Sequence, residues 1–275
     1  MSERDEYQPG VPCWVDTGQP DPEAAVEFYR GLFGWEFEGP GPMPGDPPGR
    51  YFVARLGGRD VAAVGSQPSE GAPPIPAWNT YIWVESVDES TQNVRSAGGT
   101  VILEPFDVAP AGRMAVLADP EGGIFCAWEA KDRQGAQRVN EPGAWSMSIL
   151  NARDPEGAKK FYGAVFGWAN DTFESDIGEV TLWRLPGYVG GEPQQPVSRD
   201  VVGVMVPMSG DRFPDDAPSH WSVNFWVDDA DATAGKAADL GGTIVVPPFD
   251  TSVSRDAVIA DPQGAVFSVS TTPGR

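Results

Sequence analysis

The sequence of 275 residues contains a single histidine, His220, and only two cysteines, Cys13 and Cys126. One imidazole excludes any mechanism that needs two or three histidines. Two thiols cannot build a disulfide framework, and an intracellular protein keeps them reduced. Both cysteines lie in otherwise apolar, strand-like runs, which favours buried, inert thiols over a nucleophile at Cys126. His220 has no acid or nucleophile at motif spacing, which makes it a weak candidate for a catalytic base.

Positive charge and long apolar runs are also scarce. Nineteen cations, of which only four are lysines, face 40 acidic residues, so the net charge is −21. This charge disfavours nucleic-acid and anionic-lipid partners. No apolar run approaches the ~20 residues that span a membrane, and the charged N-terminus does not resemble a signal peptide. We therefore expect a cytoplasmic monomer or homodimer that binds neither nucleic acid nor membrane.

What the sequence does contain is an internal duplication. An Asp-Pro-Glu motif, a Phe-Tyr pair and a Phe-Gly-Trp motif lie within residues 21–35 and recur within 154–168. Gly-Gly-Thr, Pro-Phe-Asp and Asp-Pro motifs follow in the same order in both copies. A period of about 140 residues is too long for a solenoid and indicates a duplicated domain. We predict one domain at 1–130, a polar linker at 131–142 and a second domain at 143–275.

Each copy carries a helix whose two ends can be identified in the sequence. Asp21 is a good N-cap, Pro22 suits the first turn, and Gly34 ends the helix. Between them lies one apolar stripe at helical spacing, formed by Ala25, Phe28, Tyr29 and Leu32. The second copy repeats this pattern from Asp154 to Gly167. Short strand-like runs and a weaker second helix follow, so each domain should contain two βαβββ modules.

This order of elements and motifs resembles the vicinal-oxygen-chelate superfamily. The superfamily includes glyoxalases, extradiol dioxygenases, fosfomycin-resistance enzymes and bleomycin-binding proteins. Within it, the chain is most similar to a two-domain actinobacterial group described as glyoxalase-like or hydroxylase-like. The resemblance implies an α+β fold of two tandem domains, each with a curved, mostly antiparallel sheet around a pocket. It does not fix the function.

The resemblance also implies where metal ligands would lie. Counted from the motifs, three of these positions fall on Val15, Asn79 and Cys126 in the first copy. The corresponding positions in the second copy hold three serines, Ser148, Ser222 and Ser268. The remaining position falls within 62–65 and 202–205, where no carboxylate or imidazole is available. These residues do not suit a divalent metal, so we expect no metal and no other cofactor.

Strand alternation suggests which side chains face the two pockets. In residues 221–227, alternate positions are apolar and suit packing under a helix, while the positions between them face the pocket. The same reasoning makes Trp35 and Trp78 core residues. The predicted ligand-binding residues are Val15, Asn79, Tyr81, Trp83, Cys126 and Trp128 in the first copy, and Ser148, Ser222, Asn224, Trp226 and Ser268 in the second. In particular, Ser148, Ser222 and Ser268 should converge on one pocket. The alternative is that the aromatic rings simply fill the cavity.

Three functions remain open. A binding protein would hold a small aromatic or polyketide-like metabolite in a sequestration, resistance or accessory role. A metal-free lyase, isomerase or hydroxylase-like enzyme would act on a carbonyl compound. A structural protein would use the fold as a scaffold only. The repeat-matched Arg113 and Arg255 could anchor an anionic ligand or form loop-bracing salt bridges.

Overall fold

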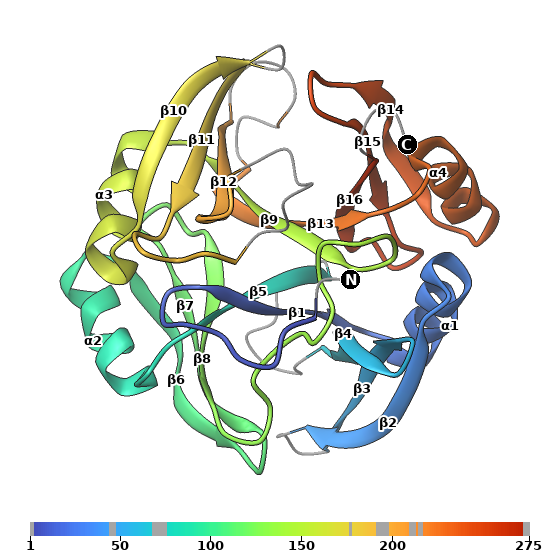
Figure 1. Ribbon diagram of the computed structural model, residues 1–275. Helices are drawn as coiled ribbons and strands as arrows, with labels where there is room; N and C mark the ends of the chain where they lie inside the picture. Colours follow the sequence, from blue (N-terminus) through green and yellow to red (C-terminus); the bar gives the residue numbers. More distant parts are fainter. Residues whose placement is uncertain are drawn as a thin grey trace.

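The computed structural model describes residues 3–43, 48–67, 76–175, 178–190, 198–208, 213 and 217–271. In this part of the chain, two eight-stranded sheets and four helices form two similar domains (Figure 1). The elements of the first domain are β1 (Pro12–Gln19), α1 (Pro22–Phe33), β2 (Glu36–Met43), β3 (Gly49–Leu56), β4 (Arg59–Ser66), β5 (Ala77–Trp83), α2 (Val87–Ser96), β6 (Thr100–Val108), β7 (Gly112–Ala118) and β8 (Ile124–Ala130). Those of the second are β9 (Trp145–Ala152), α3 (Pro155–Phe166), β10 (Ala169–Ser175), β11 (Gly178–Arg184), β12 (Val201–Pro207), β13 (His220–Trp226), α4 (Ala230–Asp239), β14 (Thr243–Asp250), β15 (Arg255–Ala260) and β16 (Val266–Thr271).

Each sheet is made of two four-stranded modules joined at its centre. The strand order is β2-β3-β4-β1-β5-β8-β7-β6 in the first sheet and β10-β11-β12-β9-β13-β16-β15-β14 in the second. β1 and β5 pair antiparallel at the junction, and each pairs in parallel with a strand of its own module, β4 or β8. The predicted α+β fold of tandem domains, each with two βαβββ modules, is confirmed.

The predicted ends of the first helix of each domain are also confirmed. The Asp21 carboxylate accepts a hydrogen bond from the backbone N–H of Ala24 at 3.0 Å, and Asp154 caps α3 in the same way. Gly34 and Gly167 end the helices in the left-handed region, at φ of 72° and 70°. A residue without a Cβ adopts this conformation at little cost.

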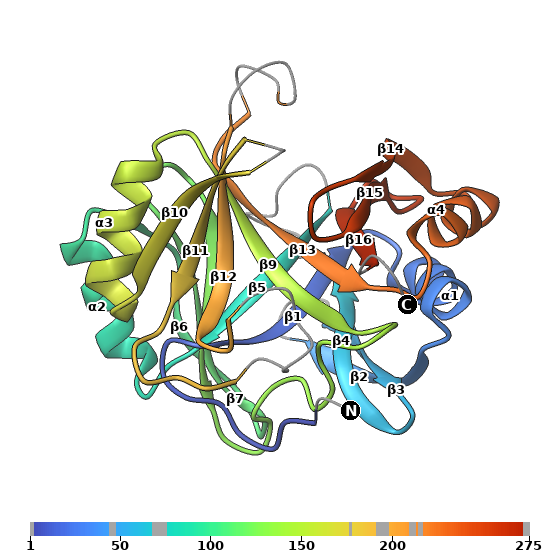
Figure 2. The ribbon, with the colours of Figure 1, turned by 45° about the horizontal axis from the view of Figure 1, so that its top comes forward.

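The two domains share two hydrophobic cores. Figures 1 and 2 show α1 beside α4 on one side of the molecule and α2 beside α3 on the other. On the α1 side, Phe33 contacts Phe225 of the second sheet, with ring centroids 5.0 Å apart. On the α3 side, Phe125 of the first sheet contacts Tyr162 at 5.9 Å. Each core therefore combines the first module of one domain with the second module of the other.

Two matched hydrogen bonds cross the domain boundary within these cores. The hydroxyl of Tyr29 on α1 donates to Asp261 of the second domain at 2.9 Å. The hydroxyl of Tyr162 on α3 donates to Asp119 of the first domain at 3.0 Å. Each tyrosine in turn accepts a hydrogen bond from a buried indole N–H, those of Trp78 and Trp221. The repeated Phe-Tyr and Asp-Pro motifs thus join the two domains to each other.

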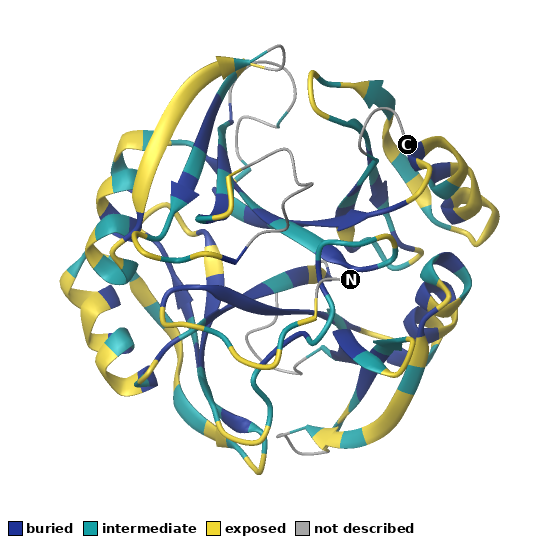
Figure 3. Cartoon of the chain, in the orientation of Figure 1, coloured by how far each residue is buried: buried dark blue, intermediate teal, exposed yellow. Residues whose placement is uncertain are grey.

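The buried residues lie where the sheets and helices of the two domains meet. Figure 3 shows buried residues along the central strands and on the inner faces of the helices. Trp35 and Trp78 are 1% and 4% exposed, as expected of core residues. None of the described helices is long and apolar enough to cross a membrane.

Candidate functional site

One face of each sheet packs on the helices and the other domain, and the opposite face forms the concave side. In the first sheet, Asp16 lies directly opposite Asn79 and Trp14 opposite Tyr81, so these four side chains share a face. The face is the one away from the helices, because Trp78, the neighbour of Asn79, bonds to Tyr29 of α1. We call it the first concave face; its residues include Trp14, Asp16, Tyr51, Asn79, Tyr81, Trp83, Cys126 and Trp128.

Two predicted pocket residues lie on the wrong side of their strands. Val15 is paired with Thr80 on the face that meets the second domain. Ser148, its counterpart, forms a buried 2.7 Å hydrogen bond with the Thr80 hydroxyl across the domain boundary. The count from the helix cap was off by one residue, which in a strand moves a side chain to the opposite face. The concave positions belong to Asp16 and, in the second sheet, to Ile149.

Asp16 is the centre of a buried polar cluster that the sequence analysis missed. Its Oδ2 atom accepts hydrogen bonds from the hydroxyls of Tyr81 at 2.7 Å and Tyr51 at 2.9 Å. Its Oδ1 atom accepts from the side-chain amide of Asn79 at 2.9 Å, and the Trp14 indole donates to Tyr51 at 3.0 Å. Three strands, β1, β3 and β5, therefore converge on one carboxyl group that is 5% exposed.

The surroundings of Asp16 set its protonation. Burial raises the pKa of its carboxyl group, and the hydrogen bonds from Asn79, Tyr81 and Tyr51 offset only part of this increase. Burial and the nearby carboxylate also raise the pKa of both tyrosines well above the ordinary value, so the phenols stay protonated. The carboxyl group of Asp16 therefore takes up a proton more readily than that of an exposed aspartate. Two phenol hydroxyls, those of Tyr51 and Tyr81, donate hydrogen bonds to it.

The interdomain linker lies against this face. The guanidinium of Arg133 lies 5.8 Å from the centroid of the Trp14 ring, and its backbone carbonyl accepts a hydrogen bond from Trp128 at 2.9 Å. The same guanidinium pairs with Asp60, which Arg55 also binds. Arg133 is close enough to Tyr51 for its charge to lower the pKa of that phenol slightly against the larger effect of burial.

The remaining predicted residues of the first copy do lie on this face. Tyr81, Cys126 and Trp128 are buried there, whereas Asn79 and Trp83 stay partly exposed. Burial raises the pKa of the thiol of Cys126 well above its ordinary value, and that of Cys13 likewise. Burial and the raised pKa both disfavour the reactive thiolate form of these cysteines. Buried aromatic rings occupy part of the face, and its partly exposed residues are Tyr51, Asn79 and Trp83.

The second concave face has a different chemistry. Ser222 pairs with Ile149, Asn224 with Ser268, and Trp226 lies opposite Ser270. Ser222 and Ser268 thus share one face as predicted, but the convergence of three serines is wrong because Ser148 lies on the other side of the sheet. Instead of an acid held by tyrosines, this face has hydroxyl and amide groups beside Ile149 and Trp226, with Asp256 opposite Ser270.

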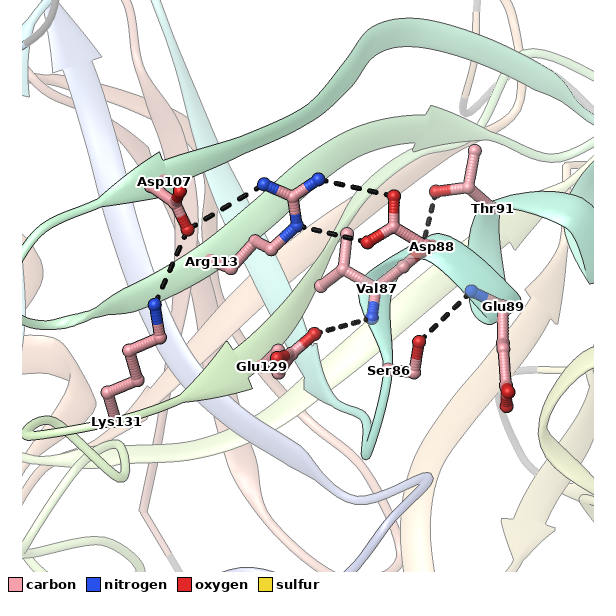
Figure 4. Close-up of polar contacts among 9 residues, drawn as sticks. All are labelled: Ser86, Val87, Asp88, Glu89, Thr91, Asp107, Arg113, Glu129 and Lys131. Carbon is pink, nitrogen blue, oxygen red and sulfur yellow. Dashed lines mark hydrogen bonds and ion pairs between the residues drawn. The ribbon is translucent and has the colours of Figure 1, made fainter.

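Arg113 and Arg255 form bracing ion pairs. Figure 4 shows the Arg113 guanidinium between Asp88, at the start of α2, and Asp107 of β6. Its Nε and Nη2 atoms donate to the two oxygens of Asp88 at 3.1 and 3.2 Å. Arg255 binds the equivalent carboxylates, Asp231 and Asp250. Of the two interpretations left open by the sequence, these contacts favour the salt bridge.

The structure also contains hollows, one of which borders the second concave face through Ser146 and Met147. A cavity of about 50 Å³, lined by residues such as Tyr7, Trp145 and Met147, lies where the N-terminal segment meets the second domain. A surface groove of about 300 Å³ separates α1 from α4. The small cavity has room for little more than water and the groove is open to solvent, so the concave faces are the better candidates for a site.

Comparison with known proteins agrees with this architecture. A family model described as the glyoxalase/bleomycin resistance protein/dioxygenase superfamily matches residues 15–126, and a glyoxalase-like domain model matches 147–270. The chain therefore belongs to this superfamily, and the predicted resemblance is confirmed.

Two relatives match nearly the whole chain. It is 42% identical to "Putative glyoxylase CFP32" of Mycobacterium tuberculosis over 274 residues, 98% of this chain and 97% of the relative. It is 34% identical to anthracycline biosynthesis protein DnrV of Streptomyces peucetius, with 96% and 94% covered.

Solved structures share the fold at low identity. The Mn(II)-bound glyoxalase from Novosphingobium aromaticivorans superposes with a TM-score of 0.61 at 18% identity, covering 96% of this chain and 82% of that one. The 2,3-dioxygenase LapB from Pseudomonas sp. KL28 gives 0.60 at 12% identity, covering 96% and 93%.

The side chains of neither concave face fit a divalent metal of the kind named in the first of these structures. The first face offers one carboxylate, Asp16, whose oxygens already accept three hydrogen bonds, and the buried thiol of Cys126. The second offers serines, asparagines, His220 and Asp256. Within the described residues, no three His, Cys, Asp or Glu side chains come together in a group that could hold a metal ion.

Proposed function

We propose that this protein binds a small, flat aromatic metabolite on the first concave face, without a metal, in a sequestration, resistance or accessory role. The observation that carries the proposal is the Asp16 cluster. A buried carboxyl group is costly unless it is fully hydrogen-bonded, and here two tyrosines and an asparagine hold it on the face of the sheet that lies away from the helices. Asp16 itself is buried, whereas its hydrogen-bond partners Tyr51 and Asn79 are partly exposed, so the cluster reaches the surface of this face.

The chemistry of the face suits such a ligand. The partly exposed rings of Tyr51 and Trp83 provide flat apolar surface, and the buried rings of Trp14, Tyr81 and Trp128 lie on the same face. Aromatic pairs add stabilisation beyond area burial. The carboxyl group of Asp16 and the hydroxyl of Tyr51 would orient a ligand hydroxyl or carbonyl. The relatedness to a protein of anthracycline biosynthesis also supports an aromatic ligand, since anthracyclines are fused-ring aromatic compounds.

Tryptophan fluorescence tests the proposal with 1,4-dihydroxyanthraquinone as the probe, a flat compound with hydroxyl and carbonyl groups. The wild-type protein should show saturable quenching. The Tyr51→Phe variant should bind the probe about tenfold more weakly, because it lacks the hydroxyl that orients the ligand. The variant also loses the hydrogen bond from Tyr51 to Asp16 and the acceptor for the Trp14 indole. Tyr188→Phe, a partly buried tyrosine of the second domain, should match the wild type. Unsaturable quenching, or equal effects of both variants, would refute the proposal.

A metal-free enzyme is the second candidate, favoured by the raised pKa of Asp16 beside two phenols. This arrangement can exchange a proton with the α-carbon of a carbonyl compound, the chemistry of an isomerase or lyase. A hydroxylation would need an oxidant that these side chains do not supply. Mass spectrometry of any bound probe after incubation distinguishes the two: turnover by the wild type but not by Asp16→Asn identifies an enzyme, and unchanged probe identifies a binding protein.

A further inference from the structure

The second concave face carries a polar network built by three strands, β9, β13 and β16. Asn224 of β13 is its centre: its side-chain amide donates to Ser146 at 2.8 Å and to Ser270 at 2.7 Å. Its carbonyl oxygen accepts from Ser268 at 2.8 Å. Nearby, Asn151 donates to Ser222 at 3.1 Å. Asn224 thus has both amide protons and its carbonyl engaged, and it fixes three hydroxyl groups in space.

These hydroxyls are partly exposed, whereas their counterparts in the first domain are largely covered. Ser222, Ser268 and Ser270 keep intermediate exposure. The positions equivalent to Ser268 and Ser270 are Cys126 and Trp128, which are 2% and 7% exposed. The second face therefore presents ordered hydrogen-bonding groups to solvent where the first presents buried side chains.

Asp256 of β15 borders this network and is incompletely satisfied. It lies directly opposite Ser270 in the sheet, so the two side chains share the concave face. Within the part of the chain that the structure describes, its buried Oδ1 atom has no hydrogen-bond partner and the carboxylate forms no ion pair, although Ser254 forms a hydrogen bond with this carboxyl group. The adjacent Arg255 pairs instead with Asp231 and Asp250. A buried acceptor without a donor costs free energy, so a ligand that supplied the donor would gain from its binding.

We propose that the second concave face binds a small hydroxylated amine, with Asp256 accepting the ammonium group and the serines around Asn224 binding the hydroxyls. An ammonium carries three donors and no acceptor, which matches an unpaired carboxylate oxygen. Serine hydroxyls donate and accept, which matches ligand hydroxyl groups. The strongly negative chain, at −21, also attracts a cation rather than an anion. This site is independent of the function proposed for the first face.

Calorimetric titration with D-glucosamine at pH 7.5 tests the proposal, with D-glucose as the ligand that lacks the amine and cyclohexylamine as the one that lacks the hydroxyls. The wild type should bind D-glucosamine at least about tenfold more tightly than either, since a charge-assisted hydrogen bond is lost in one case and the hydroxyl contacts in the other. Asp256→Asn should lose about tenfold in affinity for D-glucosamine.

Two matched variants separate this site from general effects. Asp250→Asn removes the same charge from a neighbouring exposed carboxylate that already pairs with Arg255, and it should bind D-glucosamine like the wild type. Tyr51→Phe alters the first concave face and should also leave this affinity unchanged. Absence of D-glucosamine binding, equal binding of D-glucose, or equal losses in Asp256→Asn and Asp250→Asn would each overturn the proposal.

Discussion

Replacing Asp256 by asparagine should stabilise the protein at neutral pH. Burial raises the pKa of this carboxyl group from its ordinary value of 3.8 to about 6. The folded state therefore binds the proton more tightly than the unfolded state, and stability falls as pH rises from about 4 to about 6. Each pKa unit corresponds to about 1.4 kcal/mol, so ionised Asp256 lowers the free energy of unfolding by about 3 kcal/mol. Solvent screening of this partly exposed group reduces the loss to about 2 kcal/mol. Asparagine is never charged and avoids this cost.

Urea denaturation at several pH values measures the effect. The isoelectric point near 4.2 makes pH 5.0 a practical lower limit. Between pH 5.0 and pH 7.5 the stability advantage of Asp256→Asn over the wild type should grow by about 1 kcal/mol, the share of the cost that develops in this interval. Asp250→Asn, which loses an exposed ion pair, should show no such growth. A pH-independent difference, or a variant less stable than the wild type at pH 7.5, would contradict the assignment of Asp256 as an unsatisfied acid.

Three further outcomes are expected. Tyr29→Phe and Tyr162→Phe should each destabilise the protein by about 2 kcal/mol in urea, because a buried carboxylate and an indole lose their partner; a loss below about 0.5 kcal/mol would argue against these interdomain bonds. EDTA should leave the melting temperature unchanged and elemental analysis should find no stoichiometric zinc, iron, nickel or manganese, since the donor groups are missing. Ellman's reagent should react with Cys13 and Cys126 only after unfolding, because burial raises both thiol pKa values; rapid reaction of the native protein would show an accessible thiol.

The features that the sequence predicted well are local ones. The N-cap at Asp21, the left-handed glycine at Gly34 and the apolar stripe between them are all determined by residues within one helix. The duplication then extends the prediction to the second copy. Interdomain geometry is not local: nothing near Tyr29 in the sequence indicates that its hydroxyl binds Asp261, 232 residues away.

The candidate site was harder to predict because a strand has a period of two. The count from the helix cap placed Val15 and Ser148 on the concave side, and an error of one residue reversed both. Asp16 carried an available signal, since it is the one charged residue in the strand Pro12–Gln19. Tyr51 carried none, because its contact with Asp16 depends on how β3 and β4 pair beside β1.

The duplicated positions divide into two groups according to the face that they occupy. On the helix side, many matched positions hold the same residues in both copies, as in Tyr29 and Tyr162, Trp78 and Trp221, and Phe125 and Phe267, although Val15 and Ser148 differ. On the concave side several positions differ, as in Asp16 and Ile149, Tyr81 and Asn224, and Trp128 and Ser270, although Trp83 and Trp226 match. The helix-side residues contribute to two cores that both domains share, so a change in one copy must fit the other. The concave faces contribute to neither interdomain hydrogen bond, and each can therefore acquire its own chemistry without disturbing the fold. For this reason we expect the two faces to bind different ligands, an aromatic compound on the first and a hydroxylated amine on the second.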